Sequence, residues 1–463
     1  MRKYLYEIIL SVSMLIMWFC PFLFIYLGIP YMILESIFLI LISIWVSFLL
    51  LSKEDTYYAL ITILFVPFMF SHPFDAYTIP TSLYFAVGIV VLAIVGHFFR
   101  FKVKLKFHKI FNGFVLLFIA LVIGGISTGE SYYLTQLLVV SFSGLGLLLL
   151  IVFFTSTIKN ITFKRISFLM IIFSAFIQIQ GYIALPFNAN FNLTLLNGRN
   201  VNVGWGICNN IDLILATTLP FSLYNIFNTK KLDKTFIFNL VFPLITLSSI
   251  IIFMSKGCVV ICSIISIIIY SLLLIIFRKN KQTDKFKTTL LATSIYIVSF
   301  ISILFLLNIF IPVFENFKSS FSSINVGSLN GRLEIYQYTL RNLSPNWLFG
   351  KGIFAGFSYN VDVGNGTYQW CHSTLIQVLY SCGIFGLIIM LFHLFEKYYY
   401  LFKNCTLEKV ILIISFLASG IYGLFDVSYF FINYMVLYII ITILSNDIYK
   451  LENSTLINQL KTC

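Results

Sequence analysis

The chain has 463 residues, of which 60% are hydrophobic and only 10% are charged, and its mean hydropathy is +0.97. Soluble proteins carry about a quarter charged residues, so this composition excludes an ordinary soluble enzyme. The formal net charge of +13 does not indicate nucleic-acid binding, because Lys and Arg in a membrane protein report the orientation of its loops. The sequence therefore predicts an all-α polytopic membrane protein. Its expected partner is the lipid bilayer, and no nucleic acid is expected to bind.

Apolar runs of about 20 residues, the length that crosses a bilayer as a helix, follow one another along almost the whole chain. The N-terminal run is too long for the core of a signal peptide, so it is predicted to be the first span. We count about 14 transmembrane helices in one integral membrane domain, 1–463. The spans are 5–27, 31–51, 57–71, 79–99, 110–127, 132–156, 166–186, 207–227, 235–254, 258–277, 288–312, 372–395, 410–425 and 427–446.

The basic residues give these spans an orientation. If the N-terminus is cytoplasmic, 24 of the 30 Lys and Arg fall in cytoplasmic segments, as the positive-inside rule requires. Both termini are then predicted to be cytoplasmic, in a protein of the cytoplasmic (inner) membrane. The basic run at 100–109 is interpreted as a cytoplasmic anchor, with a site for anionic lipid as the alternative. The other six basic residues fall in segments predicted to be extracytoplasmic, against the positive-inside rule: Arg199, Lys256, Lys318, Arg332, Arg341 and Lys351.

One long polar interval, 313–371, separates the eleventh and twelfth spans and is predicted to be a large extracytoplasmic loop. It contains Asn330-Gly331-Arg332, where a helix is expected to begin with Asn330 as its N-cap. The Gly-rich run Gly350–Gly356 follows, after Pro345, and its glycines allow the backbone to approach a ligand closely. His372-Ser373 and Gly383-Ile384-Phe385-Gly386-Leu387 complete the pattern at the start of the twelfth span.

The order of these motifs resembles the O-antigen polymerase/O-antigen ligase family of integral membrane glycosyltransferases. The resemblance recurs around Arg199, in the paired Asn209-Asn210, and at Ser255-Lys256-Gly257, where relatives often carry Arg in place of Lys. It implies transfer of a saccharide from an undecaprenyl-diphosphate-linked oligosaccharide to an acceptor hydroxyl outside the cytoplasm. It also implies a reaction without a metal ion or another cofactor.

Three residues are predicted to be catalytic: His372, Arg332 and Arg199. Arginine suits a diphosphate because its planar fork donates two hydrogen bonds and stays charged. His372 either takes the proton of the acceptor hydroxyl or binds the diphosphate as a cation. The structural alternatives are a solvated charge for Arg332 and an interfacial histidine for His372. For Arg199 they are an anchor that snorkels to the membrane surface or a pair with Asp212.

Three further residues are predicted to bind the substrate: Lys256, Asn209 and Lys351. Lys256 serves as a point charge for phosphate, and the alternative is a plain turn residue. A disulfide between Cys208 and Cys371 is left open by the sequence.

The expected function is polymerisation of lipid-linked repeat units into a surface polysaccharide, an O-antigen or a capsule. One alternative is an O-antigen ligase that transfers polysaccharide to an acceptor such as lipid A core. A second alternative, in another class, is a flippase for the same lipid-linked oligosaccharide, which would be expected to show two related halves with broken helices. If the protein is a polymerase, a separate flippase and a chain-length regulator are expected as its protein partners.

Overall fold

The computed structural model describes residues 31–69, 81–127, 146–159, 161–187, 201–203, 206–229, 231–253, 255–309, 332–344, 346–352, 361–362, 367–368, 371–428 and 432–451. The predicted first span, 5–27, and Arg199 lie outside the described residues. The described chain is helical apart from two short antiparallel hairpins. By its contacts the chain divides into two units, Met1–Lys106 with Phe153–Leu215 and Ser248–Lys256, and Phe107–Val152 with Ala216–Leu247 and Gly257–Cys463.

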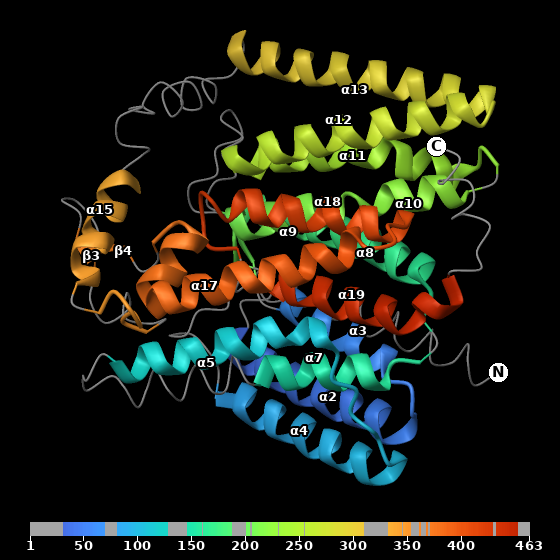
Figure 1. The fold of residues 1–463 in the computed structure, drawn as a ribbon. Coiled ribbons are helices and arrows are strands. Elements are labelled where there is room, and N and C mark those ends of the chain that lie inside the picture. The colour runs from blue at the N-terminus through green and yellow to red at the C-terminus, as the bar shows by residue number, and fades with distance from the viewer. Residues whose placement is uncertain are drawn as a thin grey trace. The chain divides into compact units, whose positions relative to one another are not determined.

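The first unit is built around two long apolar helices that lie side by side, α2 (Tyr31–Ser52) and α4 (Thr81–Phe101) (Figure 1). His97 of α4 is fully buried, and its Nδ1 lies 2.6 Å from the carbonyl oxygen of Leu50 at the end of α2. The other elements of this unit are α3 (Tyr57–Phe65), η1 (Val66–Met69), α8 (Phe163–Ala184), η4 (Leu185–Phe187), β1 (Asn202–Val203) and β2 (Gly206–Ile207).

The second unit is built around α17 (Thr374–Phe402), which packs along α5 (Asn112–Ser127) (Figure 1). Helix α15 (Arg332–Leu343) contacts α17, and α18 (Leu407–Tyr422) contacts α17, α10 (Phe221–Asn228) and α19 (Ile432–Leu451). The remaining elements of this unit are η2 (Lys109–Phe111), α13 (Thr283–Ile309), β3 (Val361–Asp362) and β4 (Thr367–Tyr368). Four helices have residues in both units: α7 (Gly146–Thr157), α9 (Cys208–Thr218), α11 (Lys234–Phe253) and α12 (Lys256–Lys279).

Every predicted span from 31–51 onward is covered at least in part by a helix. Seven helices among the described residues are long and apolar enough to cross a membrane. The helical membrane class is therefore confirmed, whereas the count of fourteen spans, the single domain and the placement of the loop 313–371 stay predictions. One expected span, 207–227, is two helices, because Pro220 follows α9 and removes a backbone donor where α10 begins.

Helix α17 is interrupted by Gly383, whose φ of 66° and ψ of −165° are not helical. The segment Asn346–Gly352 fills the interruption with its own backbone. The N–H groups of Ile384 and Phe385 donate to the carbonyl oxygens of Trp347 (3.0 Å) and Leu348 (3.1 Å). In the other direction, the N–H groups of Lys351 and Gly352 donate to the carbonyl oxygens of Tyr380 (2.8 Å) and Ser381 (2.9 Å).

Two glycines allow this contact between segment and helix. A Cβ on Gly350 would lie 2.4 Å from the Cys382 nitrogen, and one on Gly383 would lie 2.3 Å from the Leu348 carbonyl. Both residues also have positive φ, which disfavours other side chains. The approach to a ligand that the sequence suggested for this run stays a prediction, because the partner of Gly350 in the structure is the backbone of α17. The segment and the broken helix thus share backbone hydrogen bonds on both sides of Gly383.

Candidate functional site

His372 lies in the turn that leads into α17. Its backbone has φ of 47°, the left-handed region that side chains other than Gly, Asn and Asp seldom adopt. The Tyr336 hydroxyl of α15 donates to the His372 carbonyl oxygen (2.9 Å). One residue earlier, the Cys371 N–H donates to the Gln377 side-chain oxygen (3.0 Å), which supplies a partner for a donor before the helix. The turn is therefore held from both α15 and α17.

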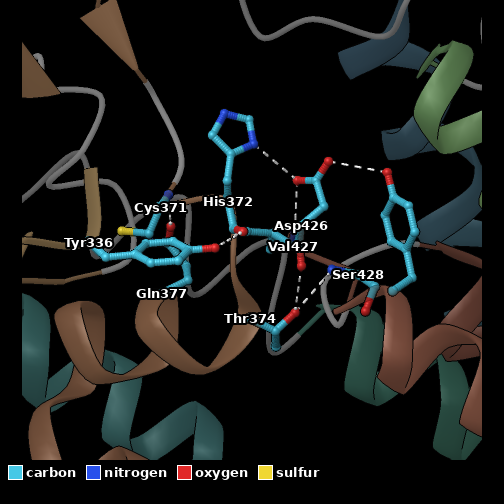
Figure 2. A network of polar contacts seen from close by, with 9 residues as sticks. Tyr336, Cys371, His372, Thr374, Gln377, Asp426, Val427 and Ser428 are labelled. Carbon is cyan, nitrogen blue, oxygen red and sulfur yellow. Dashed lines mark hydrogen bonds and ion pairs between the residues drawn. The ribbon is translucent and has the colours of Figure 1, made fainter. Parts of the chain in front are cut away.

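Asp426, in the connection between α18 and α19, is the partner of the His372 ring. Its Oδ1 lies 3.4 Å from Nδ1 of His372, and the two side chains are 17% and 33% exposed. Oδ1 also accepts the N–H of Val427 (2.8 Å), and Oδ2 accepts the Tyr422 hydroxyl (3.2 Å). Figure 2 shows this carboxylate pointing toward the imidazole of His372. The carboxylate thus lies beside one nitrogen of the ring.

Thr374 joins the α18–α19 connection to the start of α17. Its N–H donates to the carbonyl oxygen of Gly423 (2.7 Å), and its hydroxyl donates to the carbonyl oxygen of Asp426 (3.2 Å). The same hydroxyl accepts the N–H of Ser428 (3.1 Å). Because Thr374 is two residues from His372, these bonds hold the backbones that carry the acid and the imidazole in one arrangement (Figure 2).

Arg332, the first residue of α15, contributes positive charge to this cluster. Burial alone raises the pKa of Asp426, but the hydrogen bond and charge of His372, the Val427 N–H and the Arg332 charge together bring that pKa below its ordinary value. Burial raises the pKa of Tyr336, with the Asp426 charge adding to this effect and the Arg332 charge opposing it. At neutral pH the site therefore holds a carboxylate, a guanidinium and a protonated tyrosine.

The sequence of α15 explains why Arg332 lies here. Ile335, Thr339 and Leu343 recur at a spacing of four residues and are all buried, so they form the face that packs toward α17. Leu343 lies in one core cluster with Cys371 and Tyr380. Arg341, on the same helix, is exposed. Arg332, by contrast, is half-buried.

Cys371 packs beneath the turn as a buried thiol. It is a free cysteine, so the Cys208–Cys371 disulfide that the sequence left open is not formed. Burial raises its pKa to about 11, with a hydrogen bond from Thr339 opposing this effect. A thiol with such a pKa is protonated at neutral pH and is a poor nucleophile. Cys371 therefore has a packing role beneath the turn.

The start of α12 also borders this site. A Cβ on Gly257 would lie 3.7 Å from the ring of Tyr422, whose hydroxyl binds Asp426. Gly257 is the last residue of the Ser255-Lys256-Gly257 turn that the sequence singled out. In the first unit, the N–H of Ser255 donates to Oδ2 of Asp212 (3.2 Å), and Asp212 is fully buried. Asp212 therefore supports this turn in the described structure.

The structure brings together two of the six predicted site residues, His372 and Arg332, through Asp426. Lys351 belongs to the segment that fills the break in α17, and its side chain is half-buried. Asn209 lies near the start of α9 and is half-buried, and Lys256 is the first residue of α12. Both belong to the first unit. Arg199 is outside the described residues, so its role and those of Lys256, Asn209 and Lys351 stay predictions.

The sequence reasoning missed Asp426 and Tyr336. A signal for Asp426 was present, because it is an acid between two predicted membrane spans, and such residues are expensive unless they have a function. Tyr336 is four residues after Arg332, one helical turn along the same face. Neither Asp426 nor Tyr336 is part of a motif. The pair of His372 and Asp426 is identified only by the contact between their side chains, because the two residues are 54 positions apart in the sequence.

Comparison with known proteins places a family domain over part of this region. Residues 243–391 match the family model described as O-Antigen ligase, a range that includes Lys256, Arg332, Lys351 and His372. No curated protein and no solved structure matches the chain. The match confirms the resemblance to the O-antigen polymerase/ligase family that the motifs suggested. Residues 243–391 of this helical membrane chain are thus similar to an O-antigen ligase domain.

Proposed function

We propose that the protein polymerises undecaprenyl-diphosphate-linked oligosaccharide repeat units into a surface polysaccharide, an O-antigen or a capsule, outside the cytoplasm. The observation that carries this proposal is the His372–Asp426 pair, with the charge of Arg332 acting on it, in a chain with an O-antigen ligase domain. An imidazole held by a carboxylate is the usual device for removing a proton from a hydroxyl nucleophile.

In the proposed reaction, an acceptor sugar hydroxyl attacks the anomeric carbon of the donor saccharide. The new glycosidic C–O bond forms as the bond to the carrier diphosphate breaks, and the hydroxyl proton passes to Nε2 of His372. Asp426 stabilises the imidazolium that results, because its carboxylate lies beside Nδ1. The departing group is undecaprenyl diphosphate, which carries the electron pair of the broken bond.

Arg332 is proposed to bind the diphosphate as negative charge develops on it. An arginine at the start of a helix adds its guanidinium to the positive end of the helix dipole, and both favour phosphate oxygens. Stabilisation of charge that appears in the transition state is commonly the largest catalytic effect. Arg199, Lys256, Asn209 and Lys351 complete the proposed donor site.

A ligase reaction is the second candidate, because the matching family model is described as O-Antigen ligase. It would use the same donor chemistry and differ in the acceptor, which would be lipid A core or a comparable molecule. No finding supports the flippase alternative. A flippase and a chain-length regulator remain proposed protein partners.

The test is complementation of a strain that lacks this protein with Arg332→Ala and His372→Asn, scored by polysaccharide length on a gel. Arg341→Ala is the matched control, since this exposed arginine lies on the same helix. We expect the two site variants to lose the polymer ladder while single repeats still reach the cell surface. Long lipid-linked polymer that fails to reach its acceptor would indicate the ligase instead. An unchanged ladder in both site variants would rule out this assignment.

A further inference from the structure

We propose that the segment Arg100–Lys106 is a binding site for the headgroups of anionic phospholipids at the membrane surface. This segment lies outside the matched domain and outside the proposed catalytic site. It begins at the last turn of α4, one of the helices long and apolar enough to cross a membrane. The residues that follow α4 therefore emerge at the boundary between hydrocarbon and headgroups.

The segment presents cations without carboxylate partners. Arg100, Lys102, Lys104 and Lys106 are all exposed, and in the described part of the chain none of them forms an ion pair. The nearby acid Glu54 pairs with Lys159 instead. Clustered basic residues next to a membrane helix are what anionic headgroups attract.

Apolar side chains alternate with these cations. Leu105 is 51% exposed and Phe99, in the last two turns of α4, is 81% exposed. An acidic protein surface would satisfy the lysines and leave Leu105 and Phe99 in water. A membrane surface accommodates both kinds of side chain, because apolar groups enter the interface while ammonium groups reach the headgroups. The alternation therefore favours lipid over an acidic protein as the ligand.

The segment is also fixed in place. Lys102 has φ of 50°, which ends α4, and the N–H of Lys106 donates to the Ser156 hydroxyl of α7 (2.8 Å). The hydroxyls of Thr157 and Thr56 lie 2.6 Å apart and join the end of α7 to the start of α3. The cations thus lie on a supported edge that also carries Lys53 and Lys159.

The test measures lipid retained by the purified full-length protein after exchange into mixed micelles of equal phosphatidylglycerol and phosphatidylcholine. The variant combines Lys102→Gln, Lys104→Gln and Lys106→Gln. The matched control combines Lys102→Arg, Lys104→Arg and Lys106→Arg, which keeps the three positive charges at the same exposed positions. Retained lipid is counted by mass spectrometry, and membrane orientation is checked by labelling in intact cells.

We expect the first variant to lower the ratio of anionic to zwitterionic lipid at least about threefold, because a single surface lysine is worth about fivefold in partition. The control is expected to keep the wild-type ratio, and about 0.5 M salt is expected to reduce the wild-type ratio toward that of the first variant. Equal losses in both variants, or no loss in either, would overturn the proposal. Those outcomes would leave the lysines as determinants of orientation only.

Discussion

The carboxylate of Asp426 gives His372 a defined role at the scale of single residues. A solvent-facing histidine can rotate, whereas this ring has a carboxylate 3.4 Å from Nδ1, and that carboxylate is itself held by Val427 and Tyr422. In the proposed reaction, such an arrangement would leave Nε2 to meet the substrate. Asp426 would then be a positioning residue, without contact between Asp426 and the reacting atoms.

Asp426→Asn is expected to lower the rate of polymerisation by roughly 10²–10⁴-fold with little change in donor KM, because the amide does not stabilise the imidazolium. The measurement is the initial rate with purified protein and lipid-linked repeat units. Asp284→Asn, at an exposed acid in the first turn of α13, is the control and should retain full activity. A rate within twofold of the wild type for Asp426→Asn would show that the pair has no catalytic importance.

The lowered pKa of Asp426 predicts how stability depends on pH. A carboxyl whose pKa is lower in the folded protein stabilises the fold fully above its unfolded value of about 3.9, and this contribution disappears as pH falls through the folded pKa. The melting temperature of the wild type should therefore exceed that of Asp426→Asn at pH 7, and the gap should close below about pH 4. Thermal scans in detergent at several pH values measure it, and a constant gap across that range would contradict the assignment.

The positive φ of His372 predicts a difference between two substitutions that both remove the imidazole. Asn adopts the left-handed region more readily than Ala, for which it costs about 1 kcal/mol. Both variants lose the partner of Asp426 and should be inactive, but His372→Asn should melt at a higher temperature than His372→Ala, which also bears the cost of the left-handed backbone. Thermal unfolding of the two variants side by side tests this, with equal melting temperatures as the contrary result.

The helical backbone of α17 is broken at Gly383, yet backbone groups beside the break still have hydrogen-bond partners. A free N–H or carbonyl in hydrocarbon is costly, so non-helical backbone at membrane depth needs partners from the protein. Here the segment Asn346–Gly352 supplies both donors and acceptors to the break at Gly383. The sequence indicated a glycine-rich run and a glycine pair in the next span, but it did not indicate that they meet.

Gly383→Ala is expected to destabilise the protein by several kcal/mol, roughly 3 or more, because the new Cβ would lie 2.3 Å from the Leu348 carbonyl and φ is positive. Gly88→Ala is the control, since no atom lies within 4 Å of a Cβ at that position of α4. It should be neutral or stabilising by up to about 1 kcal/mol. The fraction of folded, monodisperse protein after heating measures both, and equal behaviour would contradict the role of the break.

Basic side chains also serve helix ends in this protein. The Lys285 ammonium donates to the carbonyl oxygen of Thr229 after α10 (2.6 Å), and that of Lys409 donates to the carbonyl oxygens of Tyr400 and Lys403 at the end of α17. Cations near helix C-termini are favourable because the last carbonyls lack intrahelical partners. From sequence alone these lysines were counted only as markers of orientation, and the structure gives them a packing role as well.

For the whole molecule, composition was sufficient to predict a helical membrane protein, and most helix limits lie within a few residues of the predicted spans. Local patterns succeed here because each span has to be apolar along its length. They fail at Asp426 and at the break in α17, where the deciding contacts join residues far apart in sequence. His372 and Arg332 were found because motifs marked them, whereas Asp426 had only its charge.

The orientation of the molecule remains a prediction that labelling can test. Cysteines introduced at Arg341, exposed on α15, and at Lys104, exposed after α4, should lie on opposite sides of the membrane. An impermeant maleimide should label Arg341→Cys in intact cells and Lys104→Cys only after the membrane is opened, each measured above the wild-type background. Labelling of both in intact cells would refute the predicted arrangement of charges about the membrane.

The contact between Asn346–Gly352 and α17 has a consequence for how this protein can change over evolution. All four hydrogen bonds across the break use main-chain atoms, so they place no demand on which side chains those positions carry. Only the glycines with positive φ, Gly350, Gly352 and Gly383, are constrained by the geometry itself. Proteins that descend from this chain can therefore change the side chains at the other positions of Asn346–Gly352 and still keep the same backbone contact with α17.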